Sequence, residues 1–166
     1  MSNAPLVRRL QPADVEDYRR IRLATLTKEP EFFGVTLQSE AERPLAHFAG
    51  MLASSAVFGA YSGKDIVGVI RFTRATGPKE LHKGSVHGFF VEPEQRQRGV
   101  GSALMTRLID TARDVVEQLT LSVIRDNRAA IALYERFGFA TYGVEPRARR
   151  SAEGYRDMVL MALRLK

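Results

Sequence analysis

The sequence predicts one α/β domain built on a mixed, mostly antiparallel sheet of about six or seven strands flanked by about four helices. Three observations lead to this prediction. The chain has 166 residues, of which 45% are hydrophobic, and this length and composition suit a compact domain with a substantial core. Short apolar runs typical of strands alternate with segments whose apolar residues recur at helical spacing. No linker or internal repeat divides the chain, so we expect residues 1–166 to form a single domain.

The first half of the chain predicts a strand, two helices and an antiparallel hairpin. Asp14 is a residue type that begins helices, whereas Pro30 and Gly34 interrupt the helical pattern. A polar turn over residues 62–65 separates two apolar runs, which is typical of a hairpin. The expected elements are a strand over 6–10, a helix from about 14 to 28, a loop or broken helix over 29–34, a helix from about 44 to 53, and strands over 57–61 and 66–74.

The second half of the chain predicts strands and helices in alternation. Gly138 is placed to end one of these helices. Residues 158–161 are apolar on both faces of a strand, so we expect the last strand to lie inside the sheet rather than at its edge. The expected elements are a strand over 86–91, a helix after Gly99, a strand over 119–124, a helix over 129–137, and strands over 139–145 and 155–165 that flank a basic loop over 146–154.

A turn rich in arginine and glycine lies between the strand that ends at Val91 and the helix that follows Gly99. The start of a helix exposes N–H groups without intrahelical partners and carries the positive end of the helix dipole, which favours anions such as phosphate. Gly99 and Gly101 allow a ligand to approach the backbone, and Arg96 and Arg98 add positive charge. We therefore expect the turn to bind a phosphate-bearing cofactor.

The spacing within this turn excludes two common phosphate-binding motifs. A P-loop requires Gly-Lys followed by Ser or Thr, and this tripeptide is absent from the chain. The dinucleotide fingerprint requires a third glycine where Leu104 stands, and polar residues 92–98 separate the strand from the turn. The remaining pattern, Arg96-x-x-Gly99-x-Gly101, resembles the pyrophosphate-binding signature of the GNAT superfamily of N-acetyltransferases.

A second segment strengthens this resemblance. Residues 127–139 contain Asn127, a short helical stretch with Tyr134, and then Gly138-Phe139. This order is similar to the later motif of the GNAT superfamily, and it follows the glycine turn by one helix and one strand, as in that family. The resemblance covers nearly the whole chain. It implies the GNAT fold and an acetyl-CoA-dependent N-acetyltransferase that acts on a primary amine.

The resemblance assigns cofactor-binding residues to the strand, the turn and the second motif. In the family, the strand before the turn splays away from its parallel neighbour, and its free backbone groups bind the pantetheine arm and the thioester oxygen. Asn127 resembles the residue that hydrogen-bonds the pantetheine arm, and a simple helix cap is the alternative interpretation. The expected acetyl-CoA contacts are Phe89, Phe90, Val91, Arg96, Gln97, Arg98, Gly99, Val100, Gly101, Ser102 and Asn127.

Tyr134 corresponds to the tyrosine near the CoA sulfur, the usual candidate for the general acid in the family. A phenol with an unperturbed pKa of about 10 suits this role, and a packed tyrosine is the alternative interpretation. Many members carry a glutamate base on the strand before the turn, whereas this strand offers Ser85 and His87. His87 alternates with Phe89 and Val91 along the strand and titrates near neutral pH, so it is the candidate base, with a structural hydrogen bond as the alternative.

Further candidates belong to the acceptor side of the site. Glu145, Tyr155 and Asp157 from the last strands are alternative bases, and an amine presented in its neutral form needs none. Phe32 and Phe33 lie in the segment that commonly forms one wall of the acceptor site in the family, or else they fill the core under a loop. We expect substrate contacts from Phe32, Phe33, Glu145 and Tyr155.

Composition narrows the function. The chain has no cysteine, which excludes a covalent cysteine intermediate and cysteine-ligated zinc, so we expect direct transfer and no metal. The net charge of +6 permits nucleic-acid binding, but no reader motif or interleaved aromatic residues accompany the basic ones. Arg147, Arg149 and Arg150 fit an acidic acceptor, the adenosine phosphate or a solvated loop. The alternatives are a CoA-sensing or interaction module without turnover and a basic nucleic-acid-binding domain.

The chain also lacks the sequence signals of membrane insertion and secretion. No apolar stretch approaches the length of a membrane span, and the polar start does not have the profile of a signal peptide. We therefore expect a cytoplasmic protein without membrane contact. The acceptor, a small molecule or a peptide amine, is not identified by the sequence. The oligomeric state is also open, although the resemblance favours a homodimer.

Overall fold

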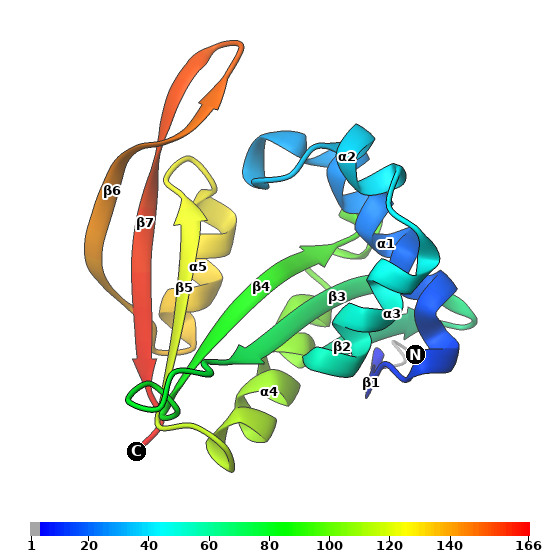
Figure 1. Ribbon diagram of the computed structural model, residues 1–166, viewed down its shortest axis with the longest axis horizontal. Helices are drawn as coiled ribbons and strands as arrows, with labels where there is room; N and C mark the ends of the chain where they lie inside the picture. The colour runs from blue at the N-terminus through cyan, green and yellow to red at the C-terminus, as the bar shows by residue number, and fades with distance from the viewer. Residues whose placement is uncertain (1–3) are drawn as a thin grey trace.

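The structure is a computed structural model that describes residues 4–166. Across these residues it contains five α-helices and one sheet of seven strands in the order β1-β2-β3-β4-β5-β7-β6 (Figure 1). Only β4 and β5 pair in parallel, so the mixed, mostly antiparallel sheet is confirmed. The strands are β1 (Leu6–Arg9), β2 (Ala56–Ser62), β3 (Asp65–Arg74), β4 (Lys83–Val91), β5 (Gln118–Ile124), β6 (Ala140–Ser151) and β7 (Gly154–Arg164). The helices are α1 (Val15–Lys28), α2 (Leu37–Ala41), α3 (Leu45–Ser54), α4 (Val100–Arg113) and α5 (Arg128–Arg136).

The helices cover the two faces of the sheet in separate layers (Figure 1). Helices α1 and α3 pack over β2 and β3, where Tyr18, Phe48 and Phe90 belong to one buried cluster. Helices α4 and α5 cover the opposite face, where Leu104 and Tyr134 belong to a second cluster. Each helix buries the apolar side of an amphipathic pattern against the sheet. We call these two sides the α1 face and the α4 face.

The basic segment near the C-terminus differs from its prediction. The loop predicted over 146–154 is wrong, because β6 and β7 continue as one antiparallel hairpin in which Arg150 pairs with Tyr155 and Ser151 with Gly154. The hairpin extends beyond the rest of the sheet (Figure 1). The polar composition of this segment reflects its exposure to solvent, since a strand outside the core needs no apolar residues.

Helix α2 and strand β7 are the next two elements to compare with the elements predicted from the sequence. The short helix α2 is an additional element outside the predicted helices, and the Thr36 hydroxyl caps it by accepting a hydrogen bond from Ser39 N at 3.1 Å. Strand β7 lies between β5 and β6, as predicted from its apolar residues on both faces. Strand β6 is therefore one edge of the sheet, and β1 is the other.

The parallel contact between β4 and β5 is short. Lys83, Gly84 and Ser85 pair with residues 118–120, and beyond this point the two strands diverge (Figure 1). Strand β4 continues to pair with β3, but the register shifts next to Gly88, whose φ of +59° is a left-handed conformation. Such a bulge bends a strand and redirects its side chains. The bend in β4 opens the sheet between β4 and β5.

Gly84 stands where β4 and β5 still pair, and it is expected to tolerate no side chain. A Cβ at this position would lie 2.2 Å from the Phe72 Cε2 atom in the core. We expect Gly84→Ala to lower the free energy of unfolding by about 1 to 3 kcal/mol through overpacking. Urea unfolding measures this change. The matched variant Gly50→Ala, with open space around an exposed position of α3, should gain about 0.5 to 1 kcal/mol instead. Equal midpoints for the two variants would contradict this account.

Candidate active site

A cavity of about 170 Å³ occupies the opening between β4 and β5. Residues 32–34, which follow α1, form its wall on the α1 face of the sheet. Tyr134 of α5 forms part of its wall on the α4 face, so the cavity reaches both sides of the sheet. The structure thus brings together segments that lie about a hundred residues apart in the chain. The lining residues are Phe32, Phe33, Gly34, Val86, His87, Gly88, Phe89, Leu121, Ser122, Val123, Asn127, Tyr134, Arg149 and Met158.

Tyr134 projects from α5 and lines the cavity. Its ring packs against Phe89 and Phe139, with ring centroids 6.0 and 5.9 Å apart. The residue is 7% exposed, and this burial raises the pKa of Tyr134 well above its usual value. The phenol therefore keeps its proton across the neutral and mildly alkaline range. A group held in this state can donate a proton to a leaving group in the cavity.

Asn127 lies at the start of α5, on the cavity wall. Its side-chain Oδ1 accepts a hydrogen bond from Ala130 N at 3.3 Å, which caps the helix. The cap uses only the carbonyl end of the amide. The Nδ2 group stays available as a donor, so the helix cap and ligand contact predicted for Asn127 are compatible.

His87 occupies the α1 face of β4, which corrects one prediction. The expected alternation of His87 with Phe89 and Val91 is wrong, because the bulge at Gly88 inserts an extra residue between them. Phe89 and Val91 pack into the cluster on the α4 face. His87 instead pairs in register with Arg71 and lies beside Thr73, whose hydroxyl is 3.0 Å from the His87 Nε2 atom.

The environment of His87 favours the neutral imidazole. Displacement of water by the surrounding protein, and then the nearby positive charge of Arg71, lower the pKa of His87 below its usual value. The ring is therefore uncharged at neutral pH, which is the form that can accept a proton. Its position on the cavity wall and this protonation state agree with a basic role.

The glycine turn presents backbone donors without a side-chain cap. Gln97 and Gly99 both adopt left-handed conformations, with φ of +59° and +81°. The Gly99 carbonyl accepts the hydrogen bond from Ala103 N, and no described side chain caps the N–H groups at the start of α4. Uncapped N–H donors and the positive end of the helix dipole coincide at this point, which suits an anion.

The residues around this turn have different surroundings. The Arg96 guanidinium donates to the Val91 carbonyl at 2.9 Å and pairs with Glu29, so its side chain ties the end of β4 to the end of α1. Arg98 is exposed. A Cβ at Gly101 would lie 3.1 Å from the Phe89 Cζ atom, so the turn of α4 packs closely against this ring. The Arg96 charge is thus paired with Glu29, whereas the exposed Arg98 forms no ion pair with a described residue.

Two of the expected substrate residues lie outside the cavity. Glu145 is exposed on β6. Tyr155 is exposed on β7, with the Arg147 guanidinium stacked 3.9 Å from its ring centroid. Asp157, the other alternative base, accepts a hydrogen bond from Arg147 N at 2.9 Å. Neither Glu145 nor Tyr155 lines the cavity, although Arg149 and Met158 of the same hairpin do.

Sequence reasoning did not assign several residues that line the cavity. Gly34 was recognised only as a helix breaker, and Ser122 on β5 gives no signal in the sequence. Arg149, for which the sequence left an acidic acceptor, the adenosine phosphate and a solvated loop open, comes from the hairpin and lines the cavity. Its guanidinium lies 3.0 to 3.3 Å from the place where a Cβ of Gly34 would stand. Only the fold of β6 against the α1–α2 connection brings these two residues together.

The comparisons with known proteins agree with this geometry. Residues 17–139 match the model of the acetyltransferase (GNAT) family. The chain belongs to this family. The N-alpha-acetyltransferase RimI of Mycobacterium tuberculosis is 34% identical over 145 residues, which cover 76% of this GNAT chain and 89% of that protein. The uncharacterized protein ML0378 of Mycobacterium leprae is 37% identical over 150 residues, which cover 87% of this chain but only 37% of that protein.

A solved structure shares the GNAT fold. The structure of yncA from Salmonella typhimurium with its cofactor acetyl-CoA aligns with a TM-score of 0.81 over 99% of this chain and 95% of that chain. The two sequences are 20% identical. This similarity extends over nearly all of both chains, so the two proteins share the overall fold.

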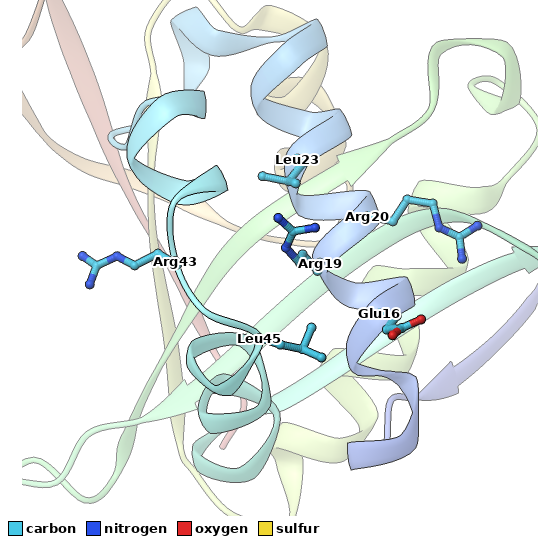
Figure 2. Close-up of a pocket in the computed structure, with 6 residues that line it drawn as sticks. All are labelled: Glu16, Arg19, Arg20, Leu23, Arg43 and Leu45. Atoms are coloured by element: carbon cyan, nitrogen blue, oxygen red, sulfur yellow. The ribbon is translucent and has the colours of Figure 1, made fainter.

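A larger depression lies elsewhere on this GNAT domain. It has a volume of about 590 Å³ and is formed by α1 and the segment that leads into α3 (Figure 2). Its polar lining is mostly arginine, but the Arg20 guanidinium pairs with Asp17 and the Arg19 guanidinium donates to the Ala41 carbonyl at 3.3 Å. The depression shares no lining residue with the cavity. We therefore place the candidate active site at the smaller cavity.

Among the described residues, no group of three or more His, Cys, Asp or Glu side chains is arranged to hold a metal ion. Within residues 4–166, every helix is too short or too polar to cross a membrane.

Proposed function

We propose that this GNAT chain is an N-acetyltransferase that moves an acetyl group from acetyl-CoA to a primary amine by direct attack. The observation that carries the proposal is the cavity between β4 and β5, where Tyr134 and Asn127 meet the diverging strand β4 beside the uncapped helix α4. Family membership and the fold shared with the structure of yncA with acetyl-CoA support it.

The residues present fit acetyl-CoA in three places. The free N–H groups at the start of α4, with Gly99, Gly101 and the exposed Arg98, suit a pyrophosphate. Strand β4 has no strand partner on its β5 side beyond Ser85, so its backbone groups there can bind an amide-bearing arm. The Nδ2 group of Asn127 adds a donor on the opposite wall.

The reaction requires an acid, an oxyanion donor and a neutral amine. Acetyl-CoA supplies an activated acetyl group as a thioester. Tyr134, kept protonated by burial, donates a proton to the departing sulfur. Backbone N–H groups of β4 that lack a β5 partner stabilise the negative charge on the carbonyl oxygen. His87, held neutral by its lowered pKa, accepts the proton of the amine. The chain has no cysteine, so the transfer is direct.

The acceptor side lies on the α1 face, where Phe32, Phe33 and Gly34 form one wall of the cavity. The proposal takes a small molecule or a peptide as the source of the amine, in a cytoplasmic protein without nucleic-acid or membrane contact. We also propose that the protein forms a homodimer. Strand β6 lies at an edge of the sheet and exposes Tyr142 and Val144, so it can pair with a second copy of the chain.

Thermal unfolding with acetyl-CoA tests the proposal directly. A ligand at about 100 times its dissociation constant stabilises the folded state by roughly 2.7 kcal/mol, which amounts to several degrees for a chain of this size. We expect this shift with acetyl-CoA, and release of CoA when a suitable amine is added. NADH and ATP serve as controls. An equal rise in the unfolding temperature with all three compounds would mean that the glycine turn binds anions without preference for acetyl-CoA. That result would contradict the proposal.

A further inference from the structure

An unusual concentration of positive charge lies beneath the bulge of β4 on the α1 face. Arg22 of α1 is 8% exposed, and its guanidinium pairs with Glu40 of α2 at 3.0 Å. Glu40 is 5% exposed, and its second oxygen lies 3.0 Å from the His47 Nε2 atom. Both oxygens of this carboxylate are therefore engaged by other groups.

Arg71 lies next to this pair without a carboxylate of its own. It pairs in register with Val57 on one side and His87 on the other, and Val57 belongs to the cluster on the α1 face. Cross-strand partners point to the same face of a sheet, so Arg71 points toward α1. Arg71 forms no ion pair with any described residue. Burial, reinforced by the like charge of Arg22, lowers the pKa of Arg71, although Tyr18 and Glu40 oppose that shift.

The local charge balance is therefore positive in a place with restricted access to water. Two guanidinium groups, Arg22 and Arg71, have one carboxylate between them, and the Nε atom of Arg22 is buried without a hydrogen-bond partner. Arg71 is half-buried, and a charge that is partly removed from water is unfavourable unless another group compensates it. No compensating group occurs among residues 4–166, which points to a ligand.

This positive site adjoins the cavity. His87 and Gly88 line the cavity, and the Nη1 atom of Arg22 lies 3.4 Å from the place where a Cβ of Gly88 would stand. Arg71 neighbours His87 across the β3–β4 pair. An anionic group bound by Arg22 and Arg71 would thus lie close to the position at which the amine reacts.

We propose that the acceptor carries a carboxylate a few bonds from its amine, as an α-amino acid does, and that Arg71 together with Arg22 binds this carboxylate. The inference rests on the proposed acetyltransferase function and names its substrate class. Guanidinium groups form paired, charge-assisted hydrogen bonds with carboxylates. The N-terminus of a peptide has a neutral amide at the same position, so it leaves the positive site uncompensated. Phe32 and Phe33 on the wall of the cavity favour an apolar side chain.

Matched acceptors test the proposal. Leucine, methionine and phenylalanine are each compared with their carboxamides and with the amines that lack the carboxyl group, and CoA release is measured at saturating acetyl-CoA. We expect kcat/KM for each amino acid to exceed that of its amide by at least about tenfold, the usual effect of a hydrogen bond to a charged group. Amides that react as well as the acids would overturn the proposal. Acetylation of a peptide N-terminus without measurable turnover of any of the nine compounds would also overturn it.

The variant Arg71→Gln separates ligand binding from a structural role. It should reduce the preference for the acid over the amide by about tenfold or more. Its unfolding temperature without ligand should not fall, because the substitution removes an uncompensated charge. The control Arg9→Gln, at an exposed position of β1, changes the net charge equally and should keep the preference. A preserved preference in Arg71→Gln would overturn the assignment.

A binding measurement keeps this test independent of turnover. Isothermal titration compares N-acetyl-L-leucine with N-acetyl-L-leucinamide in the presence of CoA, in the wild-type protein and in Arg71→Gln. We expect the acid to bind at least about tenfold more tightly to the wild type and no such difference in the variant. Equal affinities would overturn the carboxylate site even where acetyl-CoA binds. A protein that acetyl-CoA fails to stabilise would contradict the proposed function instead.

Discussion

Tyr134→Phe is expected to lower kcat by roughly 10²- to 10⁴-fold, the usual contribution of a positioned general acid. The substitution removes only the hydroxyl. The ring contacts with Phe89 and Phe139 remain, so the cavity should keep its shape. The pyrophosphate site at α4 does not involve this residue. We therefore expect little change in the affinity for acetyl-CoA.

Steady-state rates of CoA release, together with acetyl-CoA titration, measure the effect of Tyr134→Phe. Tyr142→Phe is the matched control, because Tyr142 is 62% exposed and lies outside the cavity. Unchanged turnover in Tyr134→Phe would remove the residue from the acid role. Since burial raises the pKa of Tyr134, loss of its proton should not limit activity between neutral pH and the usual tyrosine range. On the acidic side, protonation of His87 should lower the rate only below the usual histidine pKa.

Glu40→Gln is expected to lower the free energy of unfolding by about 3 to 5 kcal/mol, as when one partner of a buried ion pair is removed. The substitution leaves the shape of the side chain nearly unchanged but deletes the negative charge between Arg22 and His47. Arg22 would then be buried beside Arg71 without a carboxylate. Urea unfolding of the wild type and the variant measures the difference.

Two comparisons make the Glu40 prediction specific. Glu80→Gln removes an exposed partner of Lys83, and such surface pairs contribute at most about 1 kcal/mol. The double variant Glu40→Gln with Arg71→Gln should recover part of the loss, because it removes one of the two uncompensated charges. A Glu40→Gln variant as stable as Glu80→Gln, or a double variant with strictly additive losses, would contradict the charge balance inferred for the α1 face.

Local sequence patterns predicted where the turn before α4 and the helix that carries Tyr134 lie, whereas the binding of acetyl-CoA by these residues stays a prediction. The arginine and glycine turn lies next to a helix start, and the order of Asn127, Tyr134 and Gly138 spans a single short helix. In both cases the relevant geometry arises between residues close in sequence, where backbone preferences and helical spacing decide it. The same reasoning predicted the interior position of β7 and the antiparallel pair of β2 and β3.

The remaining features depend on contacts between distant segments. The sequence alone determined the fold class, the order of most elements and the turn at α4, because these follow from composition and local periodicity. The tertiary structure decided the bulge at Gly88, which moves His87 to the α1 face, and the extension of β6 and β7. It also decided which arginines share one carboxylate. Strand register and charge compensation depend on neighbouring residues across the sheet and on other helices. They therefore cannot be predicted from the pattern of residues along a single segment.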